Sequence, residues 1–163
     1  MIRDVTYRDA QSIANIYNFY IENTVTTFEE VALQSKDFIS RINKSNVDSL
    51  PWLVAELDGE VIGYAYATKW KERTAYRFSV EITVYLKPAL KAKGWGTRLY
   101  TNLLKKLKSN PKKIHAVIAG ISLPNAASIA LHEKIGMQQV AEFKEIGFKL
   151  NRWVDTGYWQ MIL

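Results

Sequence analysis

A single carboxylate, Glu81, lies on the polar side of an alternating segment that leads into a basic glycine turn. Across residues 78–85 the apolar side chains alternate with Ser79, Glu81, Thr83 and Tyr85, which is the period of a strand. A carboxylate in such a place can take a proton from a nucleophile, directly or through one water molecule. By position alone, an exposed glutamate with no catalytic task is the slightly favoured interpretation.

The turn that follows, residues 91–97, has the sequence KAKGWGT and leads into a helical pattern from about Thr97 to Ser109. The first amides of a helix have no intrahelical acceptors, and the helix dipole favours an anion at that end. Glycine lets the backbone come close to a bulky phosphate. The pattern is neither a P-loop nor a full dinucleotide fingerprint, so on its own it is a weak signal for an anion site. An ordinary strand-to-helix connection is the alternative.

Positive charge is concentrated around this turn. Nine of the 22 basic residues and none of the 16 acidic residues lie between Tyr85 and Ile114, which leaves 13 basic residues against 16 acidic ones elsewhere. A local positive region suits a compact polyanion. A solvated helix face is the commoner origin of such a run. Contact between the basic helix and nucleic acid phosphates is a further alternative, although no recognition motif supports it.

Length and composition favour one globular domain over residues 1–163. No apolar run reaches the ~18 residues of a membrane span, and the N-terminal residues lack the apolar segment of a signal peptide. We therefore expect a cytoplasmic protein without a membrane partner. The chain has no cysteine, which excludes disulfides, thiolate zinc sites and a cysteine nucleophile. Only two histidines are present, far apart in sequence, so no metal site is expected.

Hydrophobic periodicity and turn residues divide the chain into alternating elements. Helices are predicted at 6–24, 34–45, 97–109 and 124–137, a hairpin at 51–70 with its turn at Asp58 and Gly59, strands at 74–86 and 113–122, and two or three closing strands within 138–163. Thr6 and Asp9 have the spacing of a capping box, and Ser35 and Asn125 are the expected N-caps of the second and last helices. This order predicts an α/β (α+β) fold, a mixed sheet with helices on its faces and parallel pairing at its centre.

Residues 84–104 resemble the acetyl-coenzyme A (acetyl-CoA) motif of the Gcn5-related N-acetyltransferases (GNAT). In that motif a Gln or Arg is followed by two residues, a Gly, one residue and a Gly or Ala. Gly94 and Gly96 match it, and Lys91 departs from the usual Gln or Arg. Further segments resemble the phosphinothricin N-acetyltransferase branch, in that branch's order and over nearly the full chain: 16–21, 51–67, 69–76, 80–85, 99–104, 123–137 and 157–160.

This resemblance implies a GNAT-like fold, with a mixed, mostly antiparallel central sheet, a parallel pair at the cofactor site and helices on both faces. It also implies acetyl-CoA as co-substrate, with its pyrophosphate on the turn amides and its pantetheine arm along a splayed strand end. An amide near Leu86 would polarise the thioester carbonyl. The implied cofactor-binding residues are Val84, Tyr85, Leu86, Lys91, Ala92, Lys93, Gly94, Trp95, Gly96, Thr97, Asn125 and Ser128. For Asn125, helix capping alone is a sufficient explanation.

The resemblance further implies that Glu81 is the general base for an amine that attacks the thioester directly, without an acyl-enzyme. His132 is the second catalytic residue and would protonate the departing thiolate; a structural role is equally open. The implied substrate-binding residues are Phe28, Lys71, Arg73, Tyr76, Glu81 and Thr83. Arg73 could bind a carboxylate or phosphinate in bidentate fashion. A solvated loop explains the residues near Arg73 equally well, and core packing explains Phe28.

The expected reaction is acetyl transfer from acetyl-CoA to the α-amine of a small amino acid or analogue, such as phosphinothricin, methionine sulfoximine or methionine sulfone. A polyamine or a protein N-terminus is the alternative acceptor, and the sequence does not separate them. The branch is commonly dimeric, so a homodimer is expected. Trp153, Tyr158 and Trp159 are predicted to form an aromatic cluster in the core or in the dimer interface.

Overall fold

The structure is a computed structural model that describes residues 1–90 and 93–163. Lys91 and Ala92, both expected to bind the cofactor, lie outside the described residues. The strands are β1 (Ile2–Asp4), β2 (Trp52–Leu57), β3 (Glu60–Lys69), β4 (Ser79–Leu86), β5 (Ala116–Leu123), β6 (Gln138–Lys149) and β7 (Arg152–Ile162). The helices are α1 (Ala10–Asn23), α2 (Ser35–Val47), α3 (Trp95–Lys108) and α4 (Ala126–Lys134), with short 3₁₀ turns at Tyr7–Asp9, Thr74–Tyr76 and Pro88–Leu90.

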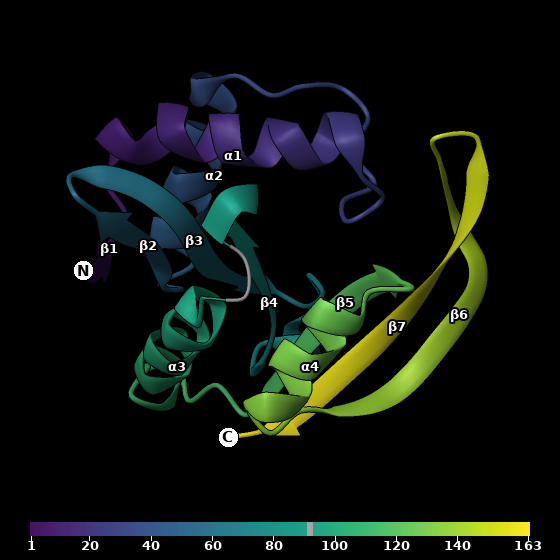
Figure 1. The fold of residues 1–163 in the computed structure, drawn as a ribbon. Coiled ribbons are helices and arrows are strands. Elements are labelled where there is room, and N and C mark those ends of the chain that lie inside the picture. Colours follow the sequence, from purple (N-terminus) through teal and green to yellow (C-terminus); the bar gives the residue numbers. More distant parts are fainter. Residues whose placement is uncertain (91–92) are drawn as a thin grey trace.

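The strands that the structure describes form one sheet in the order β1-β2-β3-β4-β5-β7-β6 (Figure 1). All neighbours in this sheet pair antiparallel except β4 and β5, which run parallel. The crossover between them contains α3, as expected of a parallel connection. The predicted mixed and mostly antiparallel sheet with a central parallel pair is therefore confirmed.

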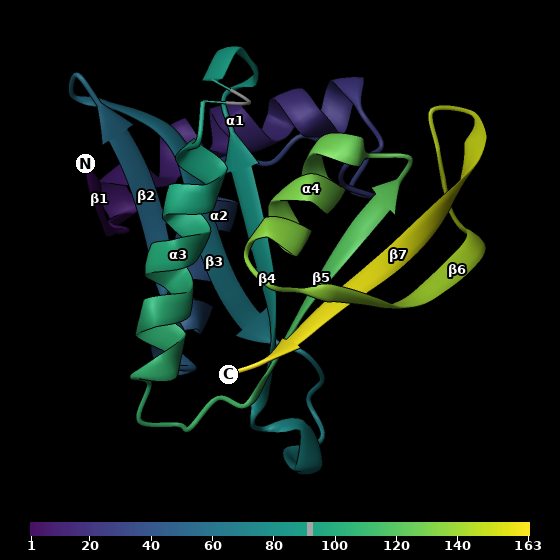
Figure 2. The same ribbon diagram turned by 60° about the horizontal axis from the view of Figure 1, so that its bottom comes forward.

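Helices cover both faces of the sheet, with α1 and α2 on one side and α3 and α4 on the other (Figures 1 and 2). On the α3 side, buried Leu99 and Leu103 pack in one cluster with Val80 and Ile82 of β4. On the α1 side the core is rich in aromatic rings, which include Tyr17, Tyr20, Tyr64 and Tyr85. Alternate residues of β4 thus belong to opposite cores, because successive strand side chains point to opposite faces.

Several element boundaries differ from the sequence prediction. β1 was not predicted; three residues are too few to show a strand period, and its pairing with β2 defines it. β4 begins at Ser79 rather than at 74, since Thr74–Tyr76 is a 3₁₀ turn. α3 begins at Trp95 rather than at Thr97, because Gly94, with φ of +79°, is its N-cap.

Two of the three predicted caps are confirmed. The Thr6 N–H donates to the Asp9 carboxylate at 2.7 Å, and the Asn125 side chain accepts the Ser128 N–H at 3.1 Å. For α2 the N-cap is Gln34 instead of Ser35, because the Asp37 carboxylate accepts the Gln34 N–H at 2.7 Å.

The C-terminal aromatic residues do not form the predicted single cluster, although core packing is confirmed for Trp159. Trp159 is fully buried in the core on the α3 side, whereas Trp153 is 62% exposed on the outer part of β7. Tyr158 instead lies edge-on to Trp70, with ring centroids 5.6 Å apart. Because Trp153 and Trp159 are six positions apart on one strand, they lie too far from each other along β7 to share a cluster.

Among the described helices, none has both the length and the apolar character to cross a bilayer.

Candidate active site

The two parallel strands separate partway along their length. The β4–β5 ladder pairs Ser79 with Ala116, Val80 with Val117 and Glu81 with Ile118, and ends there. Beyond this point β4 stays with β3 as far as Leu86, and β5 stays with β7 as far as Leu123. The result is a split in the centre of the sheet, with Glu81 at its closed end.

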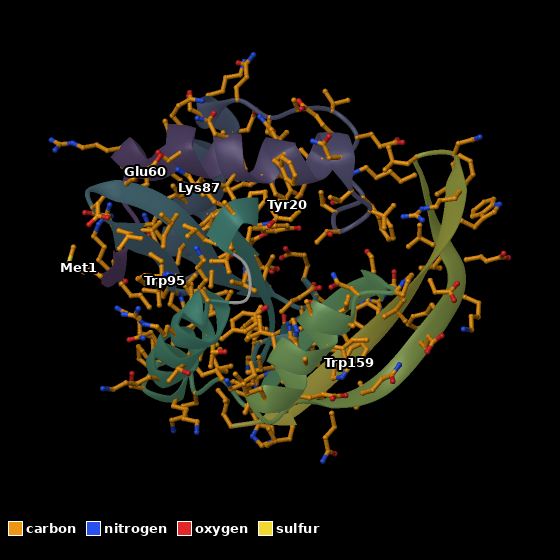
Figure 3. All side chains as sticks on the ribbon, viewed as in Figure 1. Met1, Tyr20, Glu60, Lys87, Trp95 and Trp159 are labelled. Atoms are coloured by element: carbon orange, nitrogen blue, oxygen red, sulfur yellow. The ribbon has the colours of Figure 1, made fainter. Side chains whose placement is uncertain are left out.

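The backbone groups of β4 beyond the ladder face this split. Lys87 donates its N–H to the Ile62 carbonyl at 2.8 Å, so the odd-numbered residues of β4 make the hydrogen bonds to β3. The even-numbered residues Val84 and Leu86, beyond the ladder, therefore direct their N–H and C=O groups away from β3, to the side that β5 has left. The Leu86 carbonyl accepts the hydroxyl of Tyr20, which extends from α1 (Figure 3). A ligand in the split can pair with this exposed strand edge.

A small cavity of about 50 Å³ occupies the split. Its lining comes from β4, β5, α3, α4 and the segment after α1: Thr26, Ile82, Thr83, Val84, Tyr85, Tyr100, Gly120, Ile121, Ser122, Asn125, Ser128 and His132. The structure thus brings together six residues that the sequence singled out, namely Thr83, Val84, Tyr85, Asn125, Ser128 and His132.

Glu81 sits beside this cavity in a partly buried position. Burial raises the pKa of its carboxyl group above the ordinary value, and the N–H of Gly120 and the charge of Lys71 oppose that rise. A raised pKa brings a carboxylate closer to the range in which it accepts and releases protons near neutral pH. Glu81 is therefore suited to proton transfer at the closed end of the split.

Gly120 is the residue that lets Glu81 fit against β5. A Cβ atom at this position would lie 3.3 Å from Oε1 of Glu81 and 3.2 Å from the ring of Tyr158. Both distances are tighter than ordinary van der Waals contact, so any side chain here would displace the carboxylate or the phenol ring. The glycine thus allows its own N–H to reach Glu81.

His132 is buried and forms hydrogen bonds through both ring nitrogens. Its Nδ1 lies 2.6 Å from the Ser128 carbonyl, which can only accept, so Nδ1 carries the proton. Its Nε2, 3.0 Å from the Tyr100 hydroxyl, then accepts from that hydroxyl. Burial lowers the pKa of His132 and favours the neutral ring, although the Ser128 carbonyl opposes this. The hydroxyl group facing the cavity from this pair therefore belongs to Tyr100.

The start of α3 has backbone donors without an acceptor inside the helix. Arg98 is the first residue to donate within the helix, to the Gly94 carbonyl at 3.1 Å, so the preceding amides up to Thr97 have no intrahelical acceptor. Trp95 lies in this first turn (Figure 3), and the Arg98 guanidinium stacks 4.1 Å from the centre of its ring. Together with the exposed Lys93, this end of α3 has the physical properties of an anion site.

The two glycines of the turn have different structural tasks. Gly94 adopts φ of +79°, a left-handed conformation that side chains rarely adopt, and none of the described atoms lies within 4 Å of a Cβ built there. Gly96 instead lies against α4, where a Cβ would come 3.0 Å from a methyl group of Leu131. Gly94 therefore shapes the turn, and Gly96 permits the close approach of α3 and α4.

The expected substrate residues surround the split less closely. Lys71 stacks over Trp70 at 5.0 Å and acts electrostatically on Glu81. Arg73 and Tyr76 are exposed on the segment before β4. The ring of Phe28 packs on Gly147 of β6, where a Cβ would overlap it. Of the expected substrate residues other than Glu81, only Thr83 lines the small cavity.

The sequence analysis missed Tyr100, Gly120 and Tyr158. Tyr100 belongs to the apolar face of its helix, where an aromatic residue is ordinarily core. Gly120 had a usable signal, since a glycine inside a strand indicates close approach of another group.

Within the described part of the chain, no group of three or more His, Cys, Asp or Glu residues could hold a metal ion.

The family comparison matches this geometry. The family model described as an acetyltransferase (GNAT) domain matches residues 2–158. The phosphinothricin N-acetyltransferase of Streptomyces viridochromogenes is 38% identical over 159 residues, which cover 98% of this chain and 85% of that protein. The L-methionine sulfoximine/L-methionine sulfone acetyltransferase of Salmonella typhimurium is 32% identical over 162 residues, which cover 99% and 94%.

A solved structure is similar over the whole chain. The GNAT superfamily phosphinothricin acetyltransferase of Sinorhizobium meliloti, in complex with acetyl-CoA, has a TM-score of 0.96 and 36% identity, covering 100% of this chain and 88% of that one. Fold, site geometry and sequence agree, and the chain belongs to the GNAT acetyltransferase family.

Proposed function

We propose that the protein transfers the acetyl group of acetyl-CoA to the α-amine of a small amino acid or analogue of the phosphinothricin or methionine sulfoximine type. The observation that carries this proposal is the split between β4 and β5. The partly buried Glu81 lies at its closed end, and the first amides of α3, which have no acceptor inside the helix, lie near its open end. The substrates named for the two relatives support the acceptor class.

Acetyl-CoA fits the described residues in two respects. The amides up to Thr97 and the positive charges of Lys93 and Arg98 suit the pyrophosphate. The free edge of β4 suits the pantetheine arm, which carries amides that can pair with a strand. With acetyl-CoA as its co-substrate, the enzyme is expected to act in the cytoplasm.

Glu81 is the proposed general base. It takes a proton from the substrate ammonium, directly or through one water molecule, and the neutral amine that results bonds through its lone pair to the thioester carbon. The backbone N–H groups of Val84 and Leu86 face the split and are placed to stabilise the oxyanion of the tetrahedral intermediate. No covalent acyl-enzyme is needed.

Tyr100 is the proposed proton donor to the departing thiolate, in place of His132 acting directly. As the C–S bond breaks, the Tyr100 O–H turns from Nε2 of His132 to the sulfur and gives it the phenolic proton. The products are CoA thiol and the N-acetylated amine, and the proton that Glu81 took returns to the phenolate through solvent. Before this step His132 accepts from the Tyr100 hydroxyl and so fixes the position of the phenol oxygen. Because burial keeps His132 neutral and Ser128 holds its Nδ1 proton, the histidine is proposed as a positioning residue.

The proposal is tested by thiol release from acetyl-CoA across a panel of acceptors. The panel contains phosphinothricin, methionine sulfoximine, methionine sulfone, the common amino acids, spermidine and a peptide with a free N-terminal alanine. We expect the highest kcat/KM for the first three. A peptide or spermidine turned over at least tenfold faster than every amino acid would overturn the acceptor class and leave the acetyl transfer in place.

The hairpin of β6 and β7 supports a homodimer. It extends beyond the rest of the sheet (Figures 1 and 2) and exposes apolar side chains. Those that are at least 49% exposed are Val140, Phe143, Ile146, Phe148, Leu150, Trp153 and Ile162. An exposed apolar surface of this kind on an ordered hairpin is typical of an interface, and a second copy of the chain is the proposed partner.

A further inference from the structure

A large cavity lies away from the split. It has a volume of about 410 Å³, within the roughly 300–1,000 Å³ range of small-molecule sites. Its walls come from the end of α2, the ends of β3 and β4, and the connection from α3 to β5. It borders the first residues of β4, whereas the glycine turn follows the last ones. The cavity is therefore separate from the proposed pyrophosphate site.

The floor of this cavity is apolar. Leu50, Val80 and Ile114 are buried, and Phe78 and Pro111 add further apolar surface. A hydrophobic floor of this kind binds the hydrocarbon part of a ligand by removing apolar area from water.

The rim of the cavity carries cations without counter-charges. Arg77, Lys112 and Lys113 form no ion pair with any carboxylate of the described residues. The Arg77 guanidinium stacks on the Phe78 ring at 4.4 Å and donates one N–H to the Thr74 carbonyl at 3.2 Å, which leaves other donors free. Three unpaired cations at the mouth of an apolar cavity favour an anion.

The one carboxylate in the lining does not oppose this preference. Asp48 is paired with Lys69 at 2.6 Å. This ion pair belongs to the walls of both the large cavity and a neighbouring cavity of about 260 Å³ on the α2 side. With Asp48 neutralised by Lys69, the charge that a ligand meets at the rim is that of the three unpaired cations.

We propose that this cavity is a second binding site, for a small monoanion that has an apolar body and no ammonium group. N-acyl amino acids have this chemistry, since acylation removes the positive charge and leaves the carboxylate. A free amino acid of the same side chain would bring an ammonium group among three cations and bind more weakly. The proposal does not depend on the acetyl transfer, because it rests on the cavity alone.

Methyl NMR of the protein, with labelled isoleucine and no acetyl-CoA, tests the site. Ile114 lines the large cavity and Ile121 lines the candidate active site, so the two methyl signals separate the two locations. N-acetyl-L-methionine is expected to shift the Ile114 signal in a saturable way, with at least tenfold weaker binding of L-methionine. A shift of Ile121 without a shift of Ile114 would overturn the proposal.

Charge variants provide the matched comparison. The double variant Lys112→Glu/Lys113→Glu and the single variant Arg77→Ala change exposed side chains and are each expected to weaken binding at Ile114 at least tenfold. Lys36→Glu, an exposed charge reversal at the opposite end of α2, is expected to leave binding unchanged. Unchanged binding in the rim variants, or equal affinity for inorganic phosphate, would contradict the proposed chemistry. Because acetyl-CoA is absent, failure of this experiment leaves the proposed acetyl transfer intact.

Discussion

The Tyr100 hydroxyl lies 3.0 Å from Nε2 of His132, in a buried pair that joins α3 to α4 across 32 positions of sequence. The Ser128 carbonyl holds the other ring nitrogen, which sets the direction of the bond from phenol to imidazole. A histidine expected from the sequence to donate a proton is thus an acceptor, and a tyrosine that resembled a core residue presents the hydroxyl group to the cavity.

Removing that hydroxyl should slow the chemical step. Tyr100→Phe is expected to lower kcat by roughly 10²-fold, the lower end of the range for general acid catalysis, with the Kd of acetyl-CoA nearly unchanged. His132→Leu should lower kcat less, because it only frees the phenol to rotate. Since the two residues act as a unit, the double variant should be no slower than Tyr100→Phe alone. Losses that multiply in the double variant would contradict the shared role.

Alanine in place of Gly120 and alanine in place of Gly96 should impair different kinetic constants. Gly120→Ala places a methyl group against Glu81 and Tyr158, and we expect about a tenfold or larger loss of kcat. Gly96→Ala places its methyl group against Leu131, between α3 and α4, and should raise the KM of acetyl-CoA more than it lowers kcat. Steady-state kinetics with both substrates varied separates the two. The same KM-dominated effect in both variants would count against the assigned contact of Gly120.

The ionised carboxylate of Glu81 should lower the free energy of unfolding of the ligand-free protein at neutral pH. Burial raises the pKa of this carboxyl in the folded state, so the folded protein binds the proton more tightly than the unfolded chain. The stabilisation that comes from this tighter proton binding is therefore fully present below the ordinary carboxyl pKa. It is lost as the pH rises through the raised pKa of the folded state. Glu81→Gln should accordingly have a higher Tm than the parent protein near pH 7.5.

Calorimetry of both proteins from pH 4 to 7.5 without ligands checks this sign. The Tm difference should shrink toward zero at the acidic end, where the parent carboxyl is protonated. A Glu81→Gln variant that is less stable at pH 7.5 than the parent would show that the carboxylate is stabilising and not desolvated.

The apolar hairpin should hold two chains together. Replacing Phe148 and Trp153, whose rings lie 5.0 Å apart on the exposed hairpin, by glutamate is expected to convert a dimer to a monomer at micromolar concentration. Val47→Glu is the control, because Val47 is 82% exposed but lies on α2. Light scattering after size exclusion gives the masses. A parent protein that is already monomeric, or a double variant that remains dimeric, would rule out this interface.

Much of the fold was predictable because the relevant signals are local. The Asp58-Gly59 turn, the Asn125 cap and the alternation around Glu81 each depend on neighbours in sequence. Element starts were less predictable, as at Gly94, because a helix can begin wherever backbone geometry allows. β1 depends on its partner strand and has no pattern of its own.

The site was predictable only in part, for a related reason. Glu81 and the glycine turn lie on one continuous segment, so their spacing in sequence was enough to assign both to one site. The contact of Gly120 with Glu81 depends on the parallel register that pairs Glu81 with Ile118. The bond from Tyr100 to His132 depends on how two helices pack. Neither register nor helix packing can be obtained from periodicity.

The most direct measurement of the central claim is thiol release by Glu81→Gln, with the Kd of acetyl-CoA measured on the same sample. We predict a loss of kcat of roughly 10²- to 10⁴-fold, the range expected for a general base, with cofactor affinity retained. In the parent protein kcat/KM should rise as the pH passes through the raised pKa of Glu81. The variant should lack this rise in its pH profile. Turnover like that of the parent would eliminate Glu81 as the base.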